Sequence, residues 1–421
     1  MRGDRTMTRE CTLSEVPDPR PASSGRVVTL ALMFACHALH LFGFGAIGLF
    51  LPLIRKDLGI NYTLAGVLSA CSALIYAVMQ IPAGALVDRF GPRRIFAVGT
   101  FGHAVTVLFI GLAPDYLTMA ASMLMNGFFR SLVFTPGLIM MSVWFAPERR
   151  ATAMAGFMSA AFVFSAALMT IGPRVEIWQG WRFFFVTCGA LAVVIAAVFG
   201  RAASDPPSAP APTRVAWSEV LGLFRHRFMR IVAGIQFVRL AVVYSLFFWL
   251  PTFLVDDVGL SLQASGLIIA IATLLGAPSG LVGGYVSDRT GRPVLVICVA
   301  LTALTATLST LALTESVPVI VIAITGTFLF MQCYFGPLFA APIHILGSRV
   351  AGVASGFGNF FANVGAFLCG FLLGVLRDQT GSFASGFVLL AALALIGVVL
   401  GLMLEREHAK HAKHADGMQD S

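Results

Sequence analysis

The chain has 421 residues; 58% are hydrophobic, only 11% are charged, and the formal net charge is +8. A soluble protein of this length would carry roughly a quarter charged residues to cover its surface, so the composition excludes an ordinary water-soluble domain. The basic residues lie mainly in the connections between apolar segments. This placement indicates a membrane topology and not binding to nucleic acid.

Twelve apolar segments of about 20 residues follow one another, which is the length that crosses a bilayer as an α-helix. A polar tail (residues 1–26) precedes six of them, a proline-rich linker (201–228) separates these from six more, and a second tail (405–421) ends the chain. The predicted spans cover residues 27–53, 64–86, 94–113, 116–143, 151–172, 181–200, 229–255, 263–287, 293–313, 316–346, 350–376 and 384–404.

The two sets of six share a repeated phrase. Residues 84–94 read GALVDRFGPRR and residues 284–292 read GYVSDRTGR, which places Asp88 and Asp288 200 positions apart. Duplicated halves packed in a bilayer are the usual architecture of a secondary transporter. The sequence therefore predicts an all-α membrane protein whose twelve transmembrane helices form two pseudo-symmetric six-helix bundles, residues 27–200 and 229–404.

Lys and Arg are unevenly divided between the two sides of this topology. The side that carries both termini has 21 of the 28, whereas the opposite side has only Arg55, Lys56, Arg174, Arg182 and Arg377. Because cytoplasmic loops carry the excess of basic residues, we expect both termini in the cytoplasm. The abundance of Ala, Gly and Arg over Lys is typical of a GC-rich bacterial source, so we expect a multi-pass protein of the plasma (bacterial inner) membrane.

Two arginines fall inside predicted spans, Arg130 in the fourth and Arg239 in the seventh, while all 20 acidic residues fall in tails or loops. An arginine within the bilayer costs about 2.5–3.5 kcal/mol on the insertion scale, and a guanidinium binds carboxylate or phosphate oxygens through forked hydrogen bonds. Both arginines are therefore candidates to bind an organic anion. The alternatives are a structural or proton-coupling role for Arg130 and a water-filled position for Arg239.

Other polar side chains within the spans are few. His37 and His40 lie one turn apart on the first span and share a face. Because imidazole titrates near neutrality, they are candidates for proton coupling and substrate binding; the alternative is a pair of packed, hydrogen-bonded histidines. The remaining candidates for the lining of a cavity, each of which could instead form a helix-to-helix hydrogen bond, are Asn126, Gln236, Tyr244, Gln332, Tyr334, Asn359 and Asn363.

Five stretches together resemble the major facilitator superfamily. They are residues 84–94, the weaker copy at 284–292, WFAPERR at 144–150, GWR at 180–182 and RDQTGS at 377–382. The last stretch is similar to the turn before the twelfth helix in the organic-anion-transporting branches of that family. The resemblance implies two six-helix bundles that rock around a central cavity lined mainly by helices one, four, seven and ten. Arg130 and Arg239 lie on two of these helices.

The charges of the repeated loop are candidates for a gate. Asp88 can complement the positive N-terminus of a neighbouring helix, and arginines of adjacent loops offer it partners, so an ion-pair cluster here would hold the cytoplasmic mouth shut. The alternative is that these charges only fix the topology. The predicted gating residues are Gly84, Asp88, Arg89, Gly91, Arg93, Arg94, Glu148, Arg150, Asp288 and Arg289.

The sequence has no motif for catalysis. The seven cysteines are scattered without metal-ligand spacing, and neither a phosphate-binding loop nor a nucleotide-binding domain is recognisable. We therefore expect no enzyme, no ATP-driven pump, no cofactor and no metal. The sequence predicts a monomeric secondary transporter of a small organic anion, a carboxylate, in symport with a proton or ion. The alternatives are a carrier of a neutral or zwitterionic solute, such as a sugar or short peptide, and a non-transporting membrane sensor on the same scaffold.

Overall fold

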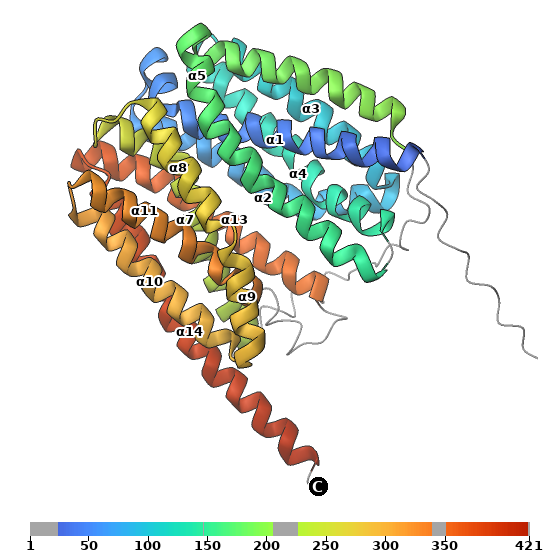
Figure 1. Cartoon of the computed structure of the whole chain (residues 1–421), viewed down its shortest axis with the longest axis vertical. Helices are drawn as coiled ribbons and strands as arrows, with labels where there is room; N and C mark the ends of the chain where they lie inside the picture. Colours follow the sequence, from blue (N-terminus) through green and yellow to red (C-terminus); the bar gives the residue numbers. More distant parts are fainter. Residues whose placement is uncertain (1–23, 146, 205–225, 339–350, 420–421) are drawn as a thin grey trace, which may run out of the picture.

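The computed structural model describes residues 24–145, 147–204, 226–338 and 351–419. These residues form helices joined by short connections (Figure 1). The helices are α1 (Ser24–Asp57), α2 (Tyr62–Phe90), α3 (Pro92–Leu112), α4 (Tyr116–Trp144), α5 (Pro147–Ala202), α7 (Arg227–Asp256), α8 (Leu262–Gly276), α9 (Ser279–Thr290), α10 (Pro293–Leu313), α11 (Val317–Cys333), α13 (Ala351–Thr380) and α14 (Ala384–Gln419).

Eleven segments of the described chain are long and apolar enough to cross a bilayer. One of them, Ser159–Ala202, has 44 residues because α5 contains two passages that meet at Gly180. This glycine has a φ of 79° inside the helix, a conformation that glycine adopts without steric cost. α8 and α9 together make a single passage, Leu262–Thr290. The described part of the chain therefore has twelve passages that can cross a bilayer, and the predicted fold class is confirmed.

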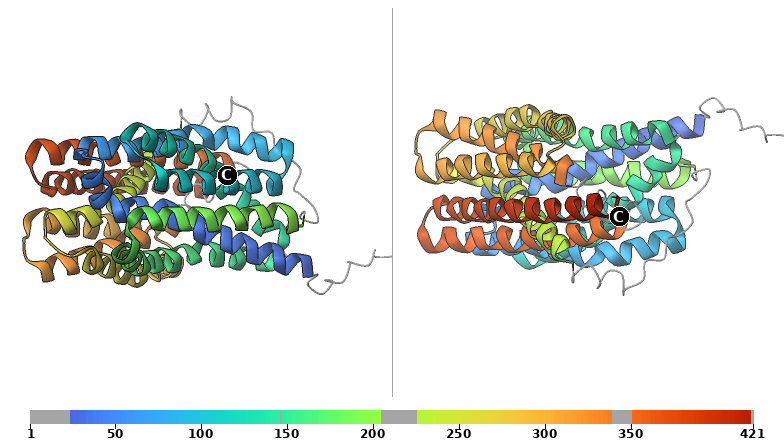
Figure 2. Two further views of the ribbon diagram at one scale, coloured as in Figure 1. Left: turned by 90° about the horizontal axis from the view of Figure 1, so that it is seen from above. Right: turned by 90° about the horizontal axis from the view of Figure 1, so that it is seen from below.

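The helices form two groups, which are the two six-helix bundles (Figures 1 and 2). α1 to α5 pack on one another in the first bundle, and α7 to α14 pack on one another in the second. The bundles meet through three pairs of helices, α1 with α7, α2 with α13 and α5 with α8. They converge at the end where α1 and α7 finish and diverge toward the end where α1 begins and α14 finishes (Figure 1).

Glycines bring the two bundles into backbone contact at the convergent end. A Cβ added to Gly48 of α1 would lie 2.5 Å from the carbonyl oxygen of Phe247 in α7. A Cβ added to Gly66 of α2 would lie 3.0 Å from the carbonyl oxygen of Phe371 in α13. Small residues permit this close approach in a bilayer, where packing of backbone on backbone stabilises helix association. The two bundles are thus joined by tight helix-to-helix seams.

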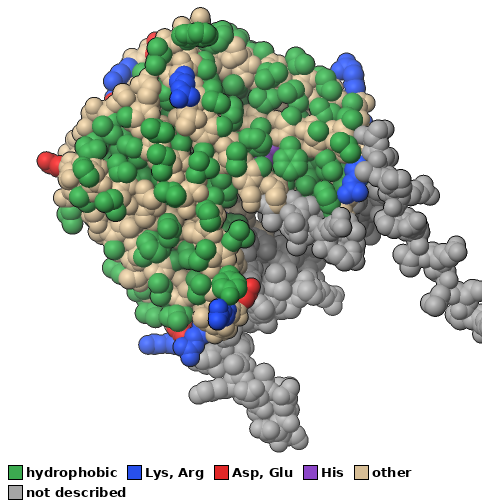
Figure 3. Space-filling model, viewed as in Figure 1, with side chains coloured by type: hydrophobic (Ala, Val, Ile, Leu, Met, Phe, Trp, Pro, Cys, Tyr) green, Lys and Arg blue, Asp and Glu red, His purple; other side chains and the backbone are tan. Residues whose placement is uncertain are grey.

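The surface of the helical body is largely apolar, with charged side chains gathered toward the two ends (Figure 3). This is the distribution that a lipid environment requires. α14 continues as a helix to Gln419, beyond the predicted end of the last span at residue 404. The predicted N-terminal tail falls almost wholly on residues 1–23 and the predicted linker largely on 205–225, both of which lie outside the described residues.

Candidate functional site

Arg130 lies deep in α4 and is only 6% exposed. Its guanidinium carbon is 4.0 Å from the ring centroid of Phe44 in α1 and 4.5 Å from that of Tyr76 in α2. The negative faces of aromatic rings attract a cation. Within the described residues, none of the ion pairs links a carboxylate to Arg130. Two aromatic rings therefore stabilise the buried guanidinium. Its N–H donors lie in a planar fork that can bind an acceptor such as a carboxylate.

The same rings bring Arg130 to the boundary between the bundles. The ring centroid of Phe44 is 5.6 Å from that of Tyr244 in α7, which belongs to the second bundle. The hydroxyl of Tyr244 is buried and has no hydrogen-bond partner among the described residues. A buried hydroxyl without a partner costs free energy unless a ligand or water binds it. This places an available polar group beside the Arg130 cluster.

Arg239 forms a second cluster, within the C-terminal bundle. It is 8% exposed, its Nε donates a 2.7 Å hydrogen bond to Oε1 of Gln236, and its guanidinium carbon lies 5.2 Å from the ring centroid of Phe335. Tyr334 is fully buried and interacts electrostatically with Arg239. Three of the predicted site residues, Gln236, Arg239 and Tyr334, are thus brought together.

The predicted histidines lie in the N-terminal bundle. His37 is 5% exposed and stacks on Phe157, with ring centroids 4.2 Å apart. His40 approaches His103 of α3, with ring centroids 4.4 Å apart, so the structure adds a histidine that the sequence reasoning did not single out. Asn126 Nδ2 is 3.1 Å from His103 Nδ1.

The other predicted polar residues make contacts along or between helices. Asn126 Nδ2 donates to Oγ1 of Thr106, which joins α4 to α3. Asn363 is 4% exposed and donates to the backbone carbonyl of Asn359 within α13. The backbone carbonyl of Gln332 faces Gly280, where α11 meets α9. The bond of Asn126 is thus a helix-to-helix hydrogen bond and that of Asn363 lies within one helix; the binding role predicted for both residues stays a prediction. The described residues include no His, Cys, Asp or Glu cluster that could hold a metal ion.

Ion pairs at the convergent end tie the two bundles together. Arg55 at the end of α1 pairs with Asp256 at the end of α7 at 2.9 Å, and Lys56 lies 3.7 Å from the same carboxylate. Tyr62 at the start of α2 donates its hydroxyl to Asp256 at 3.0 Å. The Asp256 side chain is only 8% exposed, so water screens this pair less than an exposed one.

A second set of contacts reinforces this junction. Asp378 of α13 accepts hydrogen bonds from the backbone N–H groups of Tyr62 and Thr63 at 3.2 and 2.6 Å, a carboxylate complementing the start of α2. Arg377 pairs with Asp257 at 2.7 Å and lies over the ring of Tyr62. Residues from α1, α2, α7 and α13 thus close one end of the molecule. The sequence reasoning quoted Asp378 only within the stretch 377–382, and it did not single out Asp256 or Asp257.

The predicted gating residues lie at the divergent end of the molecule. Asp88 and Asp288 are exposed, and neither forms an ion pair with the described residues. Arg93 donates to the carbonyl oxygen of Gly200 at 3.2 Å, and Arg289 donates to the hydroxyl of Tyr285 at 3.1 Å. The ion-pair cluster proposed for the gate therefore stays a prediction.

The other predicted gating residues are two glycines, two arginines and two residues whose side chains the structure does not describe. Gly91 adopts a φ of 82° between α2 and α3, which explains a glycine at that tight turn. Gly84 is a half-buried residue of α2, and Arg89 and Arg94 are exposed. The side chains of Glu148 and Arg150 lie outside the described residues.

Substitution of Asp88 by alanine tests the gate in the conformation that closes this end. We expect transport to slow roughly fivefold, since loss of about 1 kcal/mol from one state changes an equilibrium by that factor, while equilibrium substrate binding is unchanged. Initial rates in proteoliposomes and binding to detergent-purified protein measure the two effects. Asp88→Glu, which keeps the charge, should restore the rate; an unchanged rate in Asp88→Ala would remove Asp88 from the gate.

Two six-helix bundles, closed by ion pairs at one end and bearing a buried cation at their boundary, define a membrane transporter. The chain belongs to the Major Facilitator Superfamily, which it matches over residues 33–370. The resemblance inferred from the sequence is thereby confirmed, and the chain is not an enzyme.

Relatives with known names cover most of the chain. A hexuronate transporter of Bacillus subtilis (strain 168) is 24% identical over 89% of this chain and 93% of its own length. A putative tartrate transporter of Agrobacterium vitis is 26% identical over 85% of each chain. A bacterial homologue of the human lysosomal transporter Spinster, solved in an inward-facing and occupied conformation, superposes with a TM-score of 0.80 at 15% identity, over 93% of this chain and 99% of its own. This last likeness concerns the fold alone.

Proposed function

We propose that this transporter carries small organic anions with a carboxylate group and binds them between the bundles at Arg130. The supporting observation is a guanidinium that is 6% exposed, rests on the rings of Phe44 and Tyr76, and has no carboxylate of the described residues as an ion-pair partner. A charge removed from water is costly unless an opposite charge joins it. An anionic substrate supplies that charge each time it binds.

We assign the other end of the substrate to the Arg239 cluster. The hydrogen bond from Arg239 to Gln236 fixes the Nε side of the guanidinium, and its central carbon lies over the ring of Phe335. Hydroxyl groups or a second acidic group of the substrate would find donors and acceptors here. A substrate held by α4 of one bundle and α7 of the other favours conformations in which both contacts are made, and differential affinity of this kind drives a conformational change.

We further propose that this conformation is open to the cytoplasm. The excess of Lys and Arg on the side of the termini favours a cytoplasmic location for that side, and it is the end at which the bundles diverge. The Arg55–Asp256 and Asp378–Tyr62 contacts would then seal the extracytoplasmic side. Transport proceeds as these contacts break and the Asp88 end closes, which is alternating access around a fixed site.

The names of the relatives favour the same class of substrate. Hexuronate and tartrate, named for two of them, are small carboxylates that also carry hydroxyl groups. A carboxylate suits the fork of an arginine, and hydroxyl groups suit Gln236 and Tyr244. Both relatives are bacterial, which supports the predicted location in a bacterial inner membrane.

A counterflow assay tests this proposal. Purified protein in liposomes is preloaded with unlabelled solute, and exchange is followed with labelled glucuronate, tartrate, galactonate, sulfoacetate, glucose and a neutral dipeptide. We expect exchange of at least one of the anions and none of glucose or the dipeptide. Exchange of glucose or dipeptide with no anion would overturn the anion assignment and leave the carrier; no exchange with any solute of the panel would also overturn it.

A further inference from the structure

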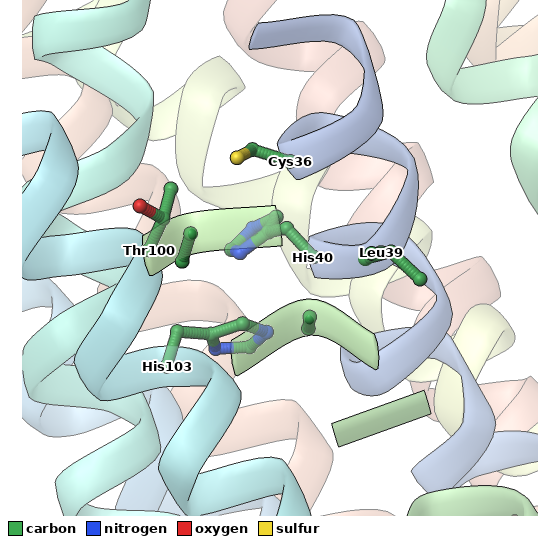
Figure 4. Close-up of a pocket in the computed structure, with 7 residues that line it drawn as sticks. Cys36, Leu39, His40, Thr100 and His103 are labelled. Carbon is green, nitrogen blue, oxygen red and sulfur yellow. The ribbon is translucent and has the colours of Figure 1, made fainter. Parts of the chain in front are cut away.

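His40 and His103 form an imidazole pair in the N-terminal bundle, apart from the proposed contacts of the anion with Arg130 and Arg239. His103 of α3 is 2% exposed, and its ring centroid lies 4.4 Å from that of His40 in α1. The two side chains extend toward each other from their helices (Figure 4). They line a small cavity together with Cys36, Leu39 and Thr100, and with two alanines of α5.

Three polar atoms around this pair are incompletely satisfied. His40 Nδ1, His103 Nε2 and Asn126 Oδ1 are buried without a hydrogen-bond partner among the described residues. Asn126 Nδ2 lies 3.1 Å from His103 Nδ1 and suits the neutral ring as a donor. Rotation of the amide by half a turn would present Oδ1 instead, an acceptor for a protonated ring. Buried polar atoms without hydrogen-bond partners require an explanation. Reversible binding of a proton at this pair is one such explanation.

Arg130 connects this pair to the anion site. Asn126 and Arg130 lie one turn apart on α4, and His40 and Phe44 lie one turn apart on α1, so each pair shares a helix face. Arg130 rests on Phe44 and interacts electrostatically with both His40 and His103.

Other side chains that can ionise lie around the imidazole pair. α1 adds His37, which also interacts with His40, and Cys36 on the cavity wall; α2 adds Tyr76 beside Arg130; α5 adds only alanines to the cavity. Of these groups, Arg130 alone carries a permanent charge.

We propose that His40 and His103 form a proton-binding site that Arg130 links to the substrate, so that one proton is bound together with each anion. This inference rests on the proposed anion site. While that site is empty, the charge of Arg130 opposes a second positive charge on the imidazoles. A bound carboxylate offsets the charge of Arg130, and a ring nitrogen then accepts a proton from the water on the open side. Release of the anion on the other side restores the repulsion, and the proton returns to water there.

The test compares net accumulation with exchange, using the anion of the panel that exchanges fastest. With one proton per singly charged anion, a gradient of one pH unit drives roughly tenfold accumulation, whereas counterflow requires no net proton movement. We expect His103→Asn, whose amide oxygen can replace Nδ1 as the acceptor for Asn126 but cannot titrate, to lose the accumulation while it retains most of the exchange. Cys36→Ala alters the same cavity without removing an imidazole and should accumulate like the wild type.

A second measurement needs no variant. Addition of the anion to weakly buffered, purified wild-type protein should raise the pH reported by an indicator dye, because protons enter the protein. Normal pH-driven accumulation in His103→Asn, or no pH change in a wild type that exchanges anions, would overturn the proton site and leave the proposed function intact. A wild type that exchanges no anion would instead overturn the proposed function, and the coupling with it.

Discussion

Replacement of Arg130 by glutamine is expected to lower the exchange rate of the preferred anion about 100-fold. A forked pair of hydrogen bonds between a guanidinium and a carboxylate contributes roughly 3 kcal/mol, which corresponds to that factor. Glutamine retains a polar head but has neither the charge nor the planar fork. The measurement is the initial rate of counterflow at equal amounts of reconstituted protein, with thermal unfolding in detergent to compare stability.

Two further variants separate charge from geometry. Arg130→Lys restores the charge without the fork, so we expect an intermediate loss of about tenfold. Arg201→Gln removes an exposed arginine at the end of α5, which donates a hydrogen bond to the carbonyl oxygen of Ala197 in the same helix, and should exchange at the wild-type rate. If Arg130→Gln exchanges anions normally, the substrate is not bound at Arg130.

Replacement of Asp256 by asparagine is expected to open the convergent end of the molecule. Arg55, Lys56 and Tyr62 all depend on this carboxylate, and its loss leaves the cation of Arg55 with a neutral partner in a site where that side chain is only 17% exposed. A cost of about 2 kcal/mol in the closed state shifts its population roughly 30-fold. Transport should slow, because the state described here becomes harder to reach.

The change in population can be measured with spin labels on the ends of α1 and α7 at the convergent end, whose separation should increase in Asp256→Asn. The matched control is Asp57→Asn. Asp57 pairs with Arg182 at 3.1 Å at the same end, but both residues belong to the first bundle, so the distance between bundles should not change. An Asp256→Asn variant with the wild-type distance distribution would show that the pair does not hold the bundles together.

The fold could be predicted because a bilayer permits few solutions. Backbone groups in lipid must be satisfied within each segment, so every long apolar segment becomes a helix, and the repeated Asp88 and Asp288 loops indicate how the halves correspond. Arg130 and Arg239 could be assigned to spans on the same ground, and both are buried in the structure.

The neighbours of those residues could not be predicted from the sequence. Spanning helices are apolar on all sides, so the sequence carries little information about which face of a helix meets which partner. The sequence therefore could not show that His40 of α1 meets His103 of α3. The junction of Arg55 with Asp256 joins positions far apart in the chain, although one signal was available: a side with so few basic residues has Asp256 and Asp257 directly after the seventh span.

The seams at Gly48 and Gly66 determine how the molecule can move. Each places a glycine of one bundle against a backbone carbonyl group of the other. A gap of about 0.5–1 Å between such surfaces forfeits roughly a quarter to a half of their dispersion attraction, so a partly parted seam holds the bundles together less strongly. We therefore expect joined and separated arrangements of the bundles to be favoured over arrangements with a half-opened seam.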